Sequence, residues 1–157
     1  MVAGWVNNFG ELMIIRKAGP EDFSAIFSLV SRWHDGTLLP MFEVKASMTW
    51  LTKTMSNGCV FVAEHEGVII GSISGSGMLL PWNDSVWILN CQWMYVEPES
   101  RGGGTTTALI TRLKEFVDEH STPLIISINE GHDTGLKDRF MKICGFEYLG
   151  GTFAYGF

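Results

Sequence analysis

Cysteine is scarce in this sequence, and its scarcity narrows both the fold and the cellular setting. Only three of the 157 residues are cysteine, the count is odd, and no Cys-x-x-Cys pair occurs. A disulfide-stapled fold and a structural zinc site are therefore disfavoured, and a reducing, cytoplasmic setting is expected. The four histidines stand apart, without the spacing of metal ligands on one helix face, so we expect no metal.

Long hydrophobic runs and an excess of positive charge are also missing. The apolar stretches are interrupted by Asn, Gln or Gly, so none is long enough to cross a bilayer, and the N-terminus lacks the pattern of a secretory signal. The formal net charge is −6, whereas general nucleic-acid binding depends on Lys and Arg. We therefore expect neither a membrane nor a nucleic acid among the partners.

Hydrophobic residues, in contrast, are plentiful. They make up 46% of the chain and include six Trp and ten Phe, which is enough for a sizeable core in one domain of this length. A regular strand pattern begins at Met13, so the domain is expected to span residues 13–157. Residues 1–12 are interpreted as an N-terminal extension: an expression remnant, the product of an alternative start, or an arm that packs on a partner.

Strand and helix patterns alternate along residues 13–157. Strands are predicted at residues 13–18, 59–63, 68–73, 86–96 and 124–128, with one or two more within residues 146–157. Helices are predicted from Pro20 onward and at residues 44–55, 105–120 and 135–144, and residues 78–85 are predicted to be a loop. The order β-α-α-β-β-β-α-β-α-β(β) is typical of one α/β domain with a mixed sheet flanked by helices.

Three consecutive glycines, Gly102 to Gly104, separate the long predicted strand from the helix that starts at Thr105. Glycine lets the backbone take positive φ and lets a ligand approach closely. The first turn of a helix has unpaired N–H groups and positive partial charge, and the neighbouring Arg101 adds a cation. Thr105 and the two threonines after it can donate hydroxyl hydrogen bonds or cap the helix. Together these residues predict a site for a phosphate or diphosphate.

Two common phosphate-binding motifs do not fit this run. A Walker A loop needs a lysine after its last glycine, and Thr105 stands there. The dinucleotide fingerprint Gly-x-Gly-x-x-Gly would begin at Gly102 and has Thr107 in place of its third glycine. A nucleotide-binding module of unrelated fold and a glycine turn without a ligand remain as alternatives.

The same run resembles a motif of the GNAT superfamily of acyl-CoA-dependent N-acyltransferases. Arg101-Gly102-Gly103-Gly104-Thr105-Thr106 is similar to its Q/R-x-x-G-x-G/A motif, with Thr106 in the place of the usual Gly or Ala. Residues 94–98 resemble the family's strand end, and residues 145–146 resemble the Gly-Phe pair that follows its last helix. The order of elements over residues 13–157 also matches, so the resemblance implies a GNAT-like fold in a small single-domain member.

The resemblance implies an N-acetyltransferase that moves an acetyl group from acetyl-CoA to a primary amine by direct attack. The acceptor would be an amine-bearing small molecule, or the N-terminus or a lysine of a protein. It would enter near residues 33–42. The resemblance is also compatible with a homodimer. A backbone N–H near Met94 would polarise the thioester carbonyl. The residues that would hold the cosubstrate, by pairing with its pantetheine arm or by surrounding its diphosphate, are Met94, Tyr95, Val96, Arg101, Gly102, Gly103, Gly104, Thr105 and Thr106.

The family's usual proton-transfer groups are missing from this sequence. The glutamate that serves as base in one branch falls on Asn90, and the tyrosine that serves as acid falls on Met141. Asn90 and Gln92 alternate along the strand, so both amides are expected on one face, where they hold a proton-relaying water or form a plain hydrogen-bonded pair. Ser127 is a candidate acid, and so are Tyr95, Tyr148 and Tyr155. The alternative is a CoA-binding or structural protein of this fold with weakened catalysis.

Overall fold

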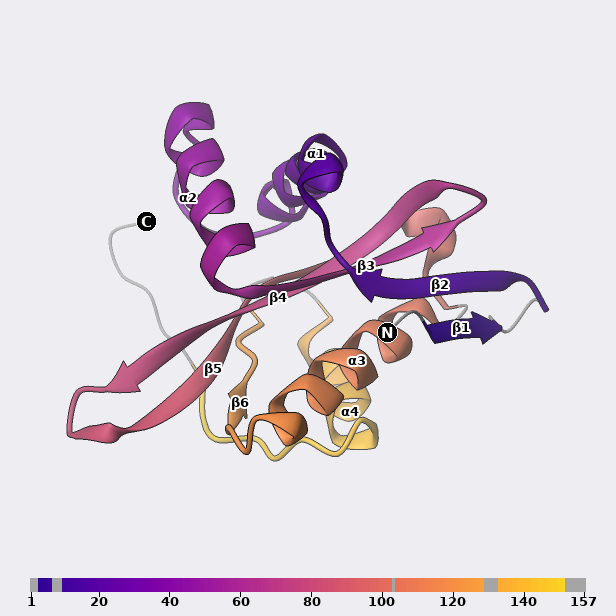
Figure 1. The fold of residues 1–157 in the computed structure, drawn as a ribbon. Coiled ribbons are helices and arrows are strands. Elements are labelled where there is room, and N and C mark those ends of the chain that lie inside the picture. Colours follow the sequence, from indigo (N-terminus) through magenta and orange to yellow (C-terminus); the bar gives the residue numbers. More distant parts are fainter. Residues whose placement is uncertain (1–2, 7–9, 103, 129–132, 152–157) are drawn as a thin grey trace.

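A six-stranded sheet organises the chain (Figure 1). The computed structural model describes residues 3–6, 10–102, 104–128 and 133–151. Every neighbouring pair of strands is antiparallel except β5 and β6, which are parallel. The strands lie side by side in sequence order: β1 (Ala3–Val6), β2 (Leu12–Lys17), β3 (Cys59–His65), β4 (Val68–Leu80), β5 (Asn83–Val96) and β6 (Leu124–Ile125).

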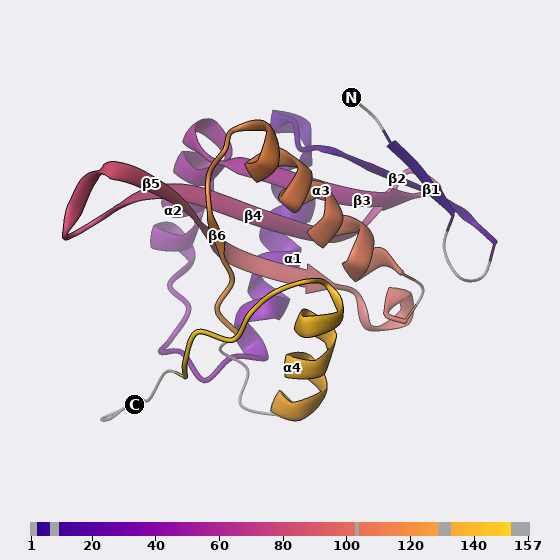
Figure 2. The same ribbon diagram turned by 90° about the horizontal axis from the view of Figure 1, so that it is seen from below.

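Two pairs of helices cover the two faces of the sheet (Figures 1 and 2). One face carries α1 (Phe23–Asp35) and α2 (Val44–Asn57), and the other carries α3 (Thr105–Glu119) and α4 (Thr134–Ile143). There are also two short 3₁₀ helices among the described residues. The first, η1 (Pro20–Asp22), precedes α1, and the second, η2 (Pro98–Ser100), precedes the turn before α3.

Each face of the sheet has its own hydrophobic core. Alternation along β3 shows this directly, because Phe61 packs under α3 whereas Val60 and Val62 pack under α1 and α2. On α3, five apolar side chains are buried in the core between the helix and the sheet: Ala108, Leu109, Ile110, Leu113 and Val117. The core under α1 and α2 is built from Ile26, Val30, Leu51, Val60, Val62 and Trp93.

The predicted α/β class, with a mixed sheet flanked by helices, is confirmed. The segment interpreted as an N-terminal extension contributes an additional edge strand, since β1 pairs with β2 from Ala3 opposite Ile15 to Val6 opposite Leu12. The observed order therefore begins with two strands before α1 rather than one.

The prediction of a loop at residues 78–85 is wrong. These residues form most of the outer end of a long β4–β5 hairpin, in which Met78 pairs with Ile88 and Leu79 with Trp87. Only residues 81–82 separate the two strands. Turn-forming residues are needed only at the tip, and cross-strand pairing sets the length of the arms, which local composition does not reveal.

The strand predicted at residues 124–128 is shorter than expected. Pairing with β5 ends at Ile125, and residues 126–128, although rich in β-branched side chains, lie beyond the ladder. The strands predicted within residues 146–157 are not found at residues 146–151, where Gly150 has a φ of 148°, outside the range of extended strands. The remainder of that prediction lies outside the described residues.

Candidate active site

A cleft opens where β5 and β6 separate. The Leu89 N–H donates to the Pro123 carbonyl at 2.8 Å, and the ladder between the two strands ends with Asn90 opposite Ile125. From Cys91 to Val96, within the described part of the chain, β5 has strand partners only on β4. Its other edge therefore borders a pocket of about 220 Å³.

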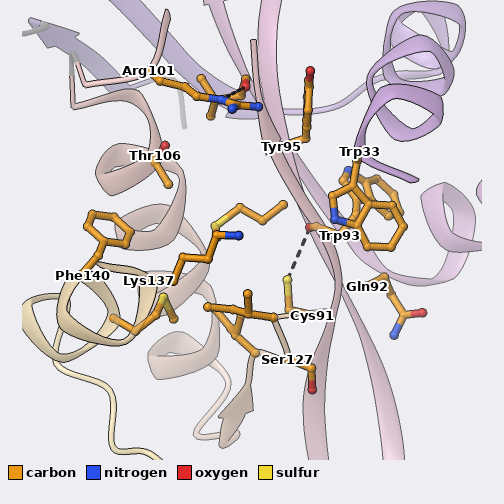
Figure 3. A pocket seen from close by; sticks show the side chains of 15 residues that line it. Trp33, Cys91, Gln92, Trp93, Tyr95, Arg101, Thr106, Ser127, Lys137 and Phe140 are labelled. Carbon is orange, nitrogen blue, oxygen red and sulfur yellow. Dashed lines mark hydrogen bonds between the residues drawn. The ribbon is translucent and has the colours of Figure 1, made fainter. Parts of the chain in front are cut away.

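Both helical layers, β5 and the stretch that follows β6 contribute to this pocket, which we call the cleft (Figure 3). Aromatic and aliphatic side chains form most of its wall, and a few polar groups point into it. The cleft is lined by Trp33, Cys91, Gln92, Trp93, Met94, Tyr95, Val96, Arg101, Thr106, Ile126, Ser127, Ile128, Lys137, Phe140 and Met141.

A β-bulge in β5 lies at the inner end of the cleft. Across β4, Trp93 pairs with Ser74 and Cys91 pairs with Gly75, so Gln92 is the additional residue. Cys91 packs under α3 whereas Trp93 packs under α1 and α2, which shows that the side-chain alternation breaks here.

The bulge interrupts side-chain alternation between Cys91 and Trp93, so the expectation that the two strand amides share one face stays a prediction. Gln92 lines the cleft, and its Nε2 donates to the Asn90 carbonyl at 3.3 Å. Asn90 itself is not among the residues that line the cleft. Its catalytic role stays a prediction, and Gln92 is the side-chain amide that the structure brings to the cleft.

Trp93 holds the bulge in place from the side of the sheet that α1 and α2 cover. Its indole N–H donates to the Ser72 hydroxyl on β4 at 2.9 Å, and both residues are buried. The indole also packs edge-on against Trp50 of α2, with ring centroids 5.2 Å apart. The irregular backbone beside the cleft is thus fixed by a buried hydrogen bond and an aromatic contact.

The glycine turn lies at the other end of the cleft. Gly102 has a φ of 80° and Gly104 a φ of 91°, a left-handed conformation that side-chain-bearing residues rarely adopt, while Gly103 lies outside the described residues. Gly104 is the N-cap of α3, and Thr105 is buried with its hydroxyl donating to the Ser100 carbonyl at 3.2 Å. Thr106, one residue later, lines the cleft.

Arg101 lies against the end of β5. Its Nε donates to the Val96 carbonyl at 2.9 Å, and its guanidinium carbon is 5.3 Å from the centre of the Tyr95 ring. The first turn of α3 and a cation therefore meet at this end of the cleft, as binding of a diphosphate requires. The residues present fit the phosphate end of CoA.

The charge of the cleft differs from that of the whole chain. Arg101 and Lys137 are the charged residues among the described residues that line it, whereas the formal net charge of the protein is −6. Burial raises the pKa of the Cys91 thiol to about 12, so Cys91 is a neutral wall residue rather than a nucleophile. The cleft is locally positive and suits an anionic ligand.

Two of the predicted acids lie in different parts of the cleft. Tyr95 is near its phosphate end, with its ring beside Arg101, and Ser127 is near the opposite end in Figure 3. Met141 lines the cleft from α4 and carries no proton that it can donate. Both Ser127 and Tyr95 stay predicted candidates, and Tyr155 lies outside the described residues.

Lys137 is the cleft residue that sequence reasoning missed. It lies four residues before Met141 on α4, and residues at this spacing share one face of a helix. That spacing was a usable signal once Met141 had been placed on the cleft side. Figure 3 shows the ammonium group of Lys137 pointing from α4 into the cleft.

The described part of the chain shows neither a metal-binding cluster nor a membrane-spanning helix. Within residues 3–6, 10–102, 104–128 and 133–151, no three His, Cys, Asp or Glu side chains gather in a way that could hold a metal ion. No helix in the described chain is long and apolar enough to cross a membrane.

Comparison with solved structures gives the fold. A predicted acetyltransferase from Clostridium acetobutylicum, solved with acetyl-CoA, is 22% identical, with a TM-score of 0.75 over 92% of this chain and 96% of that one. The aminoglycoside N-acetyltransferase AAC(6')-Iy, solved with a bisubstrate analogue, is 17% identical, with a TM-score of 0.73 over 91% and 96%. Glucosamine-6-phosphate N-acetyltransferase from Arabidopsis thaliana is 15% identical, with a TM-score of 0.72 over 94% and 99%.

Comparison of sequences gives the family. No curated protein matches this sequence at a significant level. The acetyltransferase (GNAT) domain matches residues 56–148, which is more than half of the 157-residue chain and includes the bulge, the glycine turn and most of the cleft. The chain therefore belongs to the GNAT acetyltransferase family.

Proposed function

We propose that this protein transfers an acetyl group from acetyl-CoA to a primary amine by direct attack of the amine nitrogen. One observation carries the proposal: the free edge of β5 runs along the cleft from the bulge to the glycine turn at the N-terminus of α3. Acetyl-CoA supplies the activated acetyl group, and the chain supplies binding, orientation and electrostatic stabilisation.

The edge of β5 is suited to hold the pantetheine arm. Between Cys91 and Val96, the backbone N–H and C=O groups that face away from β4 border the cleft, and an amide-containing ligand can pair with them as an added strand. The Val96 carbonyl is the exception, because it already accepts from Arg101. At the bulge the backbone changes direction, and we assign a main-chain N–H near Met94 to the negative charge that develops on the thioester oxygen.

The glycine turn is suited to hold the diphosphate. Main-chain amides of Thr105 and Thr106 belong to the first turn of α3, and Arg101 lies beside them. The side chain of Thr106 lines the cleft, so it adds a hydroxyl where the family usually has no polar group. Gly102 and Gly104 provide the left-handed conformations that close the turn.

The acceptor is proposed to enter from the α1 side. Trp33 of α1 lines the cleft, and Arg32 beside it forms an ion pair with Glu97, just beyond the end of β5. Two structural relatives are named for aminoglycosides and for glucosamine 6-phosphate, so amine-bearing small molecules are the first class to test. A protein N-terminus or lysine is the second.

A catalytically weakened CoA-binding protein is the second candidate. It is favoured by Met141, which leaves the cleft without the family's tyrosine acid, and by the position of Asn90 outside the residues that line the cleft. Binding of CoA without turnover is the result that distinguishes this candidate from the first.

The test measures thiol release from acetyl-CoA with a panel of amino sugars, polyamines and peptides. The acetyltransferase proposal expects amine-dependent release with at least one acceptor and thermal stabilisation by acetyl-CoA alone. Stabilisation without release supports the second candidate. Absence of any stabilisation at millimolar acetyl-CoA would overturn both, and a larger shift with ATP or NAD would indicate a nucleotide-binding module instead.

A further inference from the structure

One lysine on α4 reaches into the cleft. Lys137 is half-buried and lines the cleft together with Met141, one helical turn further on. In Figure 3 its ammonium group points across the cleft toward β5, at the level of Trp93 and between Ser127 and Arg101, which lies at the phosphate end. The two cations of the cleft therefore serve different parts of a ligand that extends along β5.

The other titratable groups of the cleft are poorly suited to give up a proton at its inner end. On β5, the buried Cys91 thiol donates to the Trp93 carbonyl at 3.4 Å, and burial raises its pKa to about 12. Tyr95 lies near the phosphate end, with its ring against Arg101. Arg101 itself cannot serve as an acid, because a guanidinium does not deprotonate in proteins.

The remaining elements that line the cleft contribute no titratable side chain within the described residues. The stretch after β6 provides Ile126, Ser127 and Ile128, α1 provides Trp33, and α3 provides Thr106. The neighbour of Lys137 along the helix, Asp138, forms an ion pair with Lys142 at 2.7 Å.

Amine acetylation needs an acid at the sulfur of CoA, because a thiolate is a better leaving group when its charge is neutralised as it departs. A lysine ammonium carries its proton at neutral pH and attracts a developing thiolate. We propose that Lys137 protonates the sulfur of CoA as it leaves, a role that rests on the proposed acetyltransferase function.

Protons and electrons balance in the proposed step. The amine nitrogen bonds to the acetyl carbon, the carbon–sulfur bond breaks, and its electron pair stays on sulfur. Nζ of Lys137 gives this sulfur one proton. The proton lost by the amine nitrogen goes to solvent, and solvent returns one to Lys137, so free CoA thiol, the acetylated amine and the original enzyme are formed.

Activity is the first readout, with three variants. Lys137→Met keeps the length of the side chain and removes the proton, so kcat is expected to fall about 100-fold, with the KM for acetyl-CoA little changed. Lys137→Arg keeps the charge but cannot donate its proton, so it is expected to stay nearly as slow. Lys142→Met removes a lysine from the exposed side of the same helix and is expected to match the wild type. Wild-type kcat in Lys137→Arg, or in Lys137→Met, overturns the proposal.

Ionisation of bound CoA is the second readout and needs no acceptor. Thiolate absorbance of protein-bound CoA is followed against pH, and affinity is compared with that of desulfo-CoA, which lacks the sulfur. An ammonium beside the sulfur is expected to lower the pKa of the bound thiol by about one unit, and Lys137→Met should abolish this shift. Affinity for desulfo-CoA should be equal in both proteins.

The outcomes separate this proposal from the function on which it rests. If the wild type does not bind CoA, both are wrong. If CoA binds but the thiol ionises alike in wild type and Lys137→Met, only the role of Lys137 is overturned. If Lys137→Met loses affinity for CoA and desulfo-CoA equally, Lys137 contacts another part of the ligand, and proton donation to sulfur is again overturned.

Discussion

The hydrogen bond between Ser72 and Trp93 gives the sharpest stability prediction. Ser72 and Ser74 are both fully buried on β4, two residues apart. The Ser72 hydroxyl accepts the Trp93 indole N–H at 2.9 Å, whereas the buried Ser74 hydroxyl has no hydrogen-bond partner in the described structure. The same substitution by alanine should therefore have opposite consequences at the two positions.

The magnitudes follow from the cost of leaving a buried polar group unpaired. Ser72→Ala leaves the indole N–H without its acceptor and should lower the free energy of unfolding by about 1–3 kcal/mol. Ser74→Ala removes an uncompensated hydroxyl and should be neutral or stabilising by up to about 1 kcal/mol. In a chain of 157 residues, each kcal/mol corresponds to roughly 2–4 °C in Tm.

Urea unfolding followed by tryptophan fluorescence measures both variants against the wild type. The midpoint should fall for Ser72→Ala and stay or rise for Ser74→Ala, with the slope of the transition unchanged in both. Equal destabilisation by the two substitutions would refute the reasoning, because it would show that the indole bond does not hold the bulge.

Three further predictions concern charge and thiol chemistry. Arg101→Glu should weaken CoA binding at least about tenfold in calorimetry, because a charge-assisted bond to the diphosphate is worth roughly 1.5–3 kcal/mol; unchanged affinity would contradict the site. The hydrogen bond from Arg16 lowers the pKa of Asp22, so this pair stabilises the protein above the ordinary Asp pKa and the stabilisation is lost as the pH falls through the lowered value. Asp22→Asn should therefore lower the unfolding free energy by about 1–3 kcal/mol at neutral pH, since Arg16 keeps Glu64 as a partner, and should flatten the acid limb of stability. Equal acid sensitivity of both proteins would disprove this. Burial raises the pKa of Cys59 to about 11 and of Cys91 to about 12, so mass spectrometry should find both unalkylated at neutral pH until the protein unfolds; rapid labelling of the native protein would show that the cores are open.

Features set by local chemistry were predictable from the sequence. The glycine turn followed from the conformational freedom of Gly102 and Gly104, and both have positive φ. The boundaries of α3 differ from the prediction by one residue, at its C-terminus, because the helix is defined by its own apolar periodicity and by the glycines before it.

Features set by distant parts of the chain were not predictable in the same way. The bulge at Gln92 depends on how β5 pairs with β4, which strand alternation in the sequence does not reveal. The outer arms of the β4–β5 hairpin were predicted as a loop because of nearby turn-forming residues, which are needed only at the tip of the hairpin. Lys137 reaches the cleft because α4 packs beside it, and its spacing from Met141 indicates this only once the position of α4 is known.

The most direct test of the central claim is amide hydrogen exchange with and without acetyl-CoA. The account predicts that added acetyl-CoA slows exchange along the open edge of β5, at residues 94–96, and in the first turn of α3, at Thr105 and Thr106, while the exposed end of the β4–β5 hairpin is unaffected. Exchange that stays unchanged in both segments at saturating acetyl-CoA would contradict the claim that this cleft binds coenzyme A.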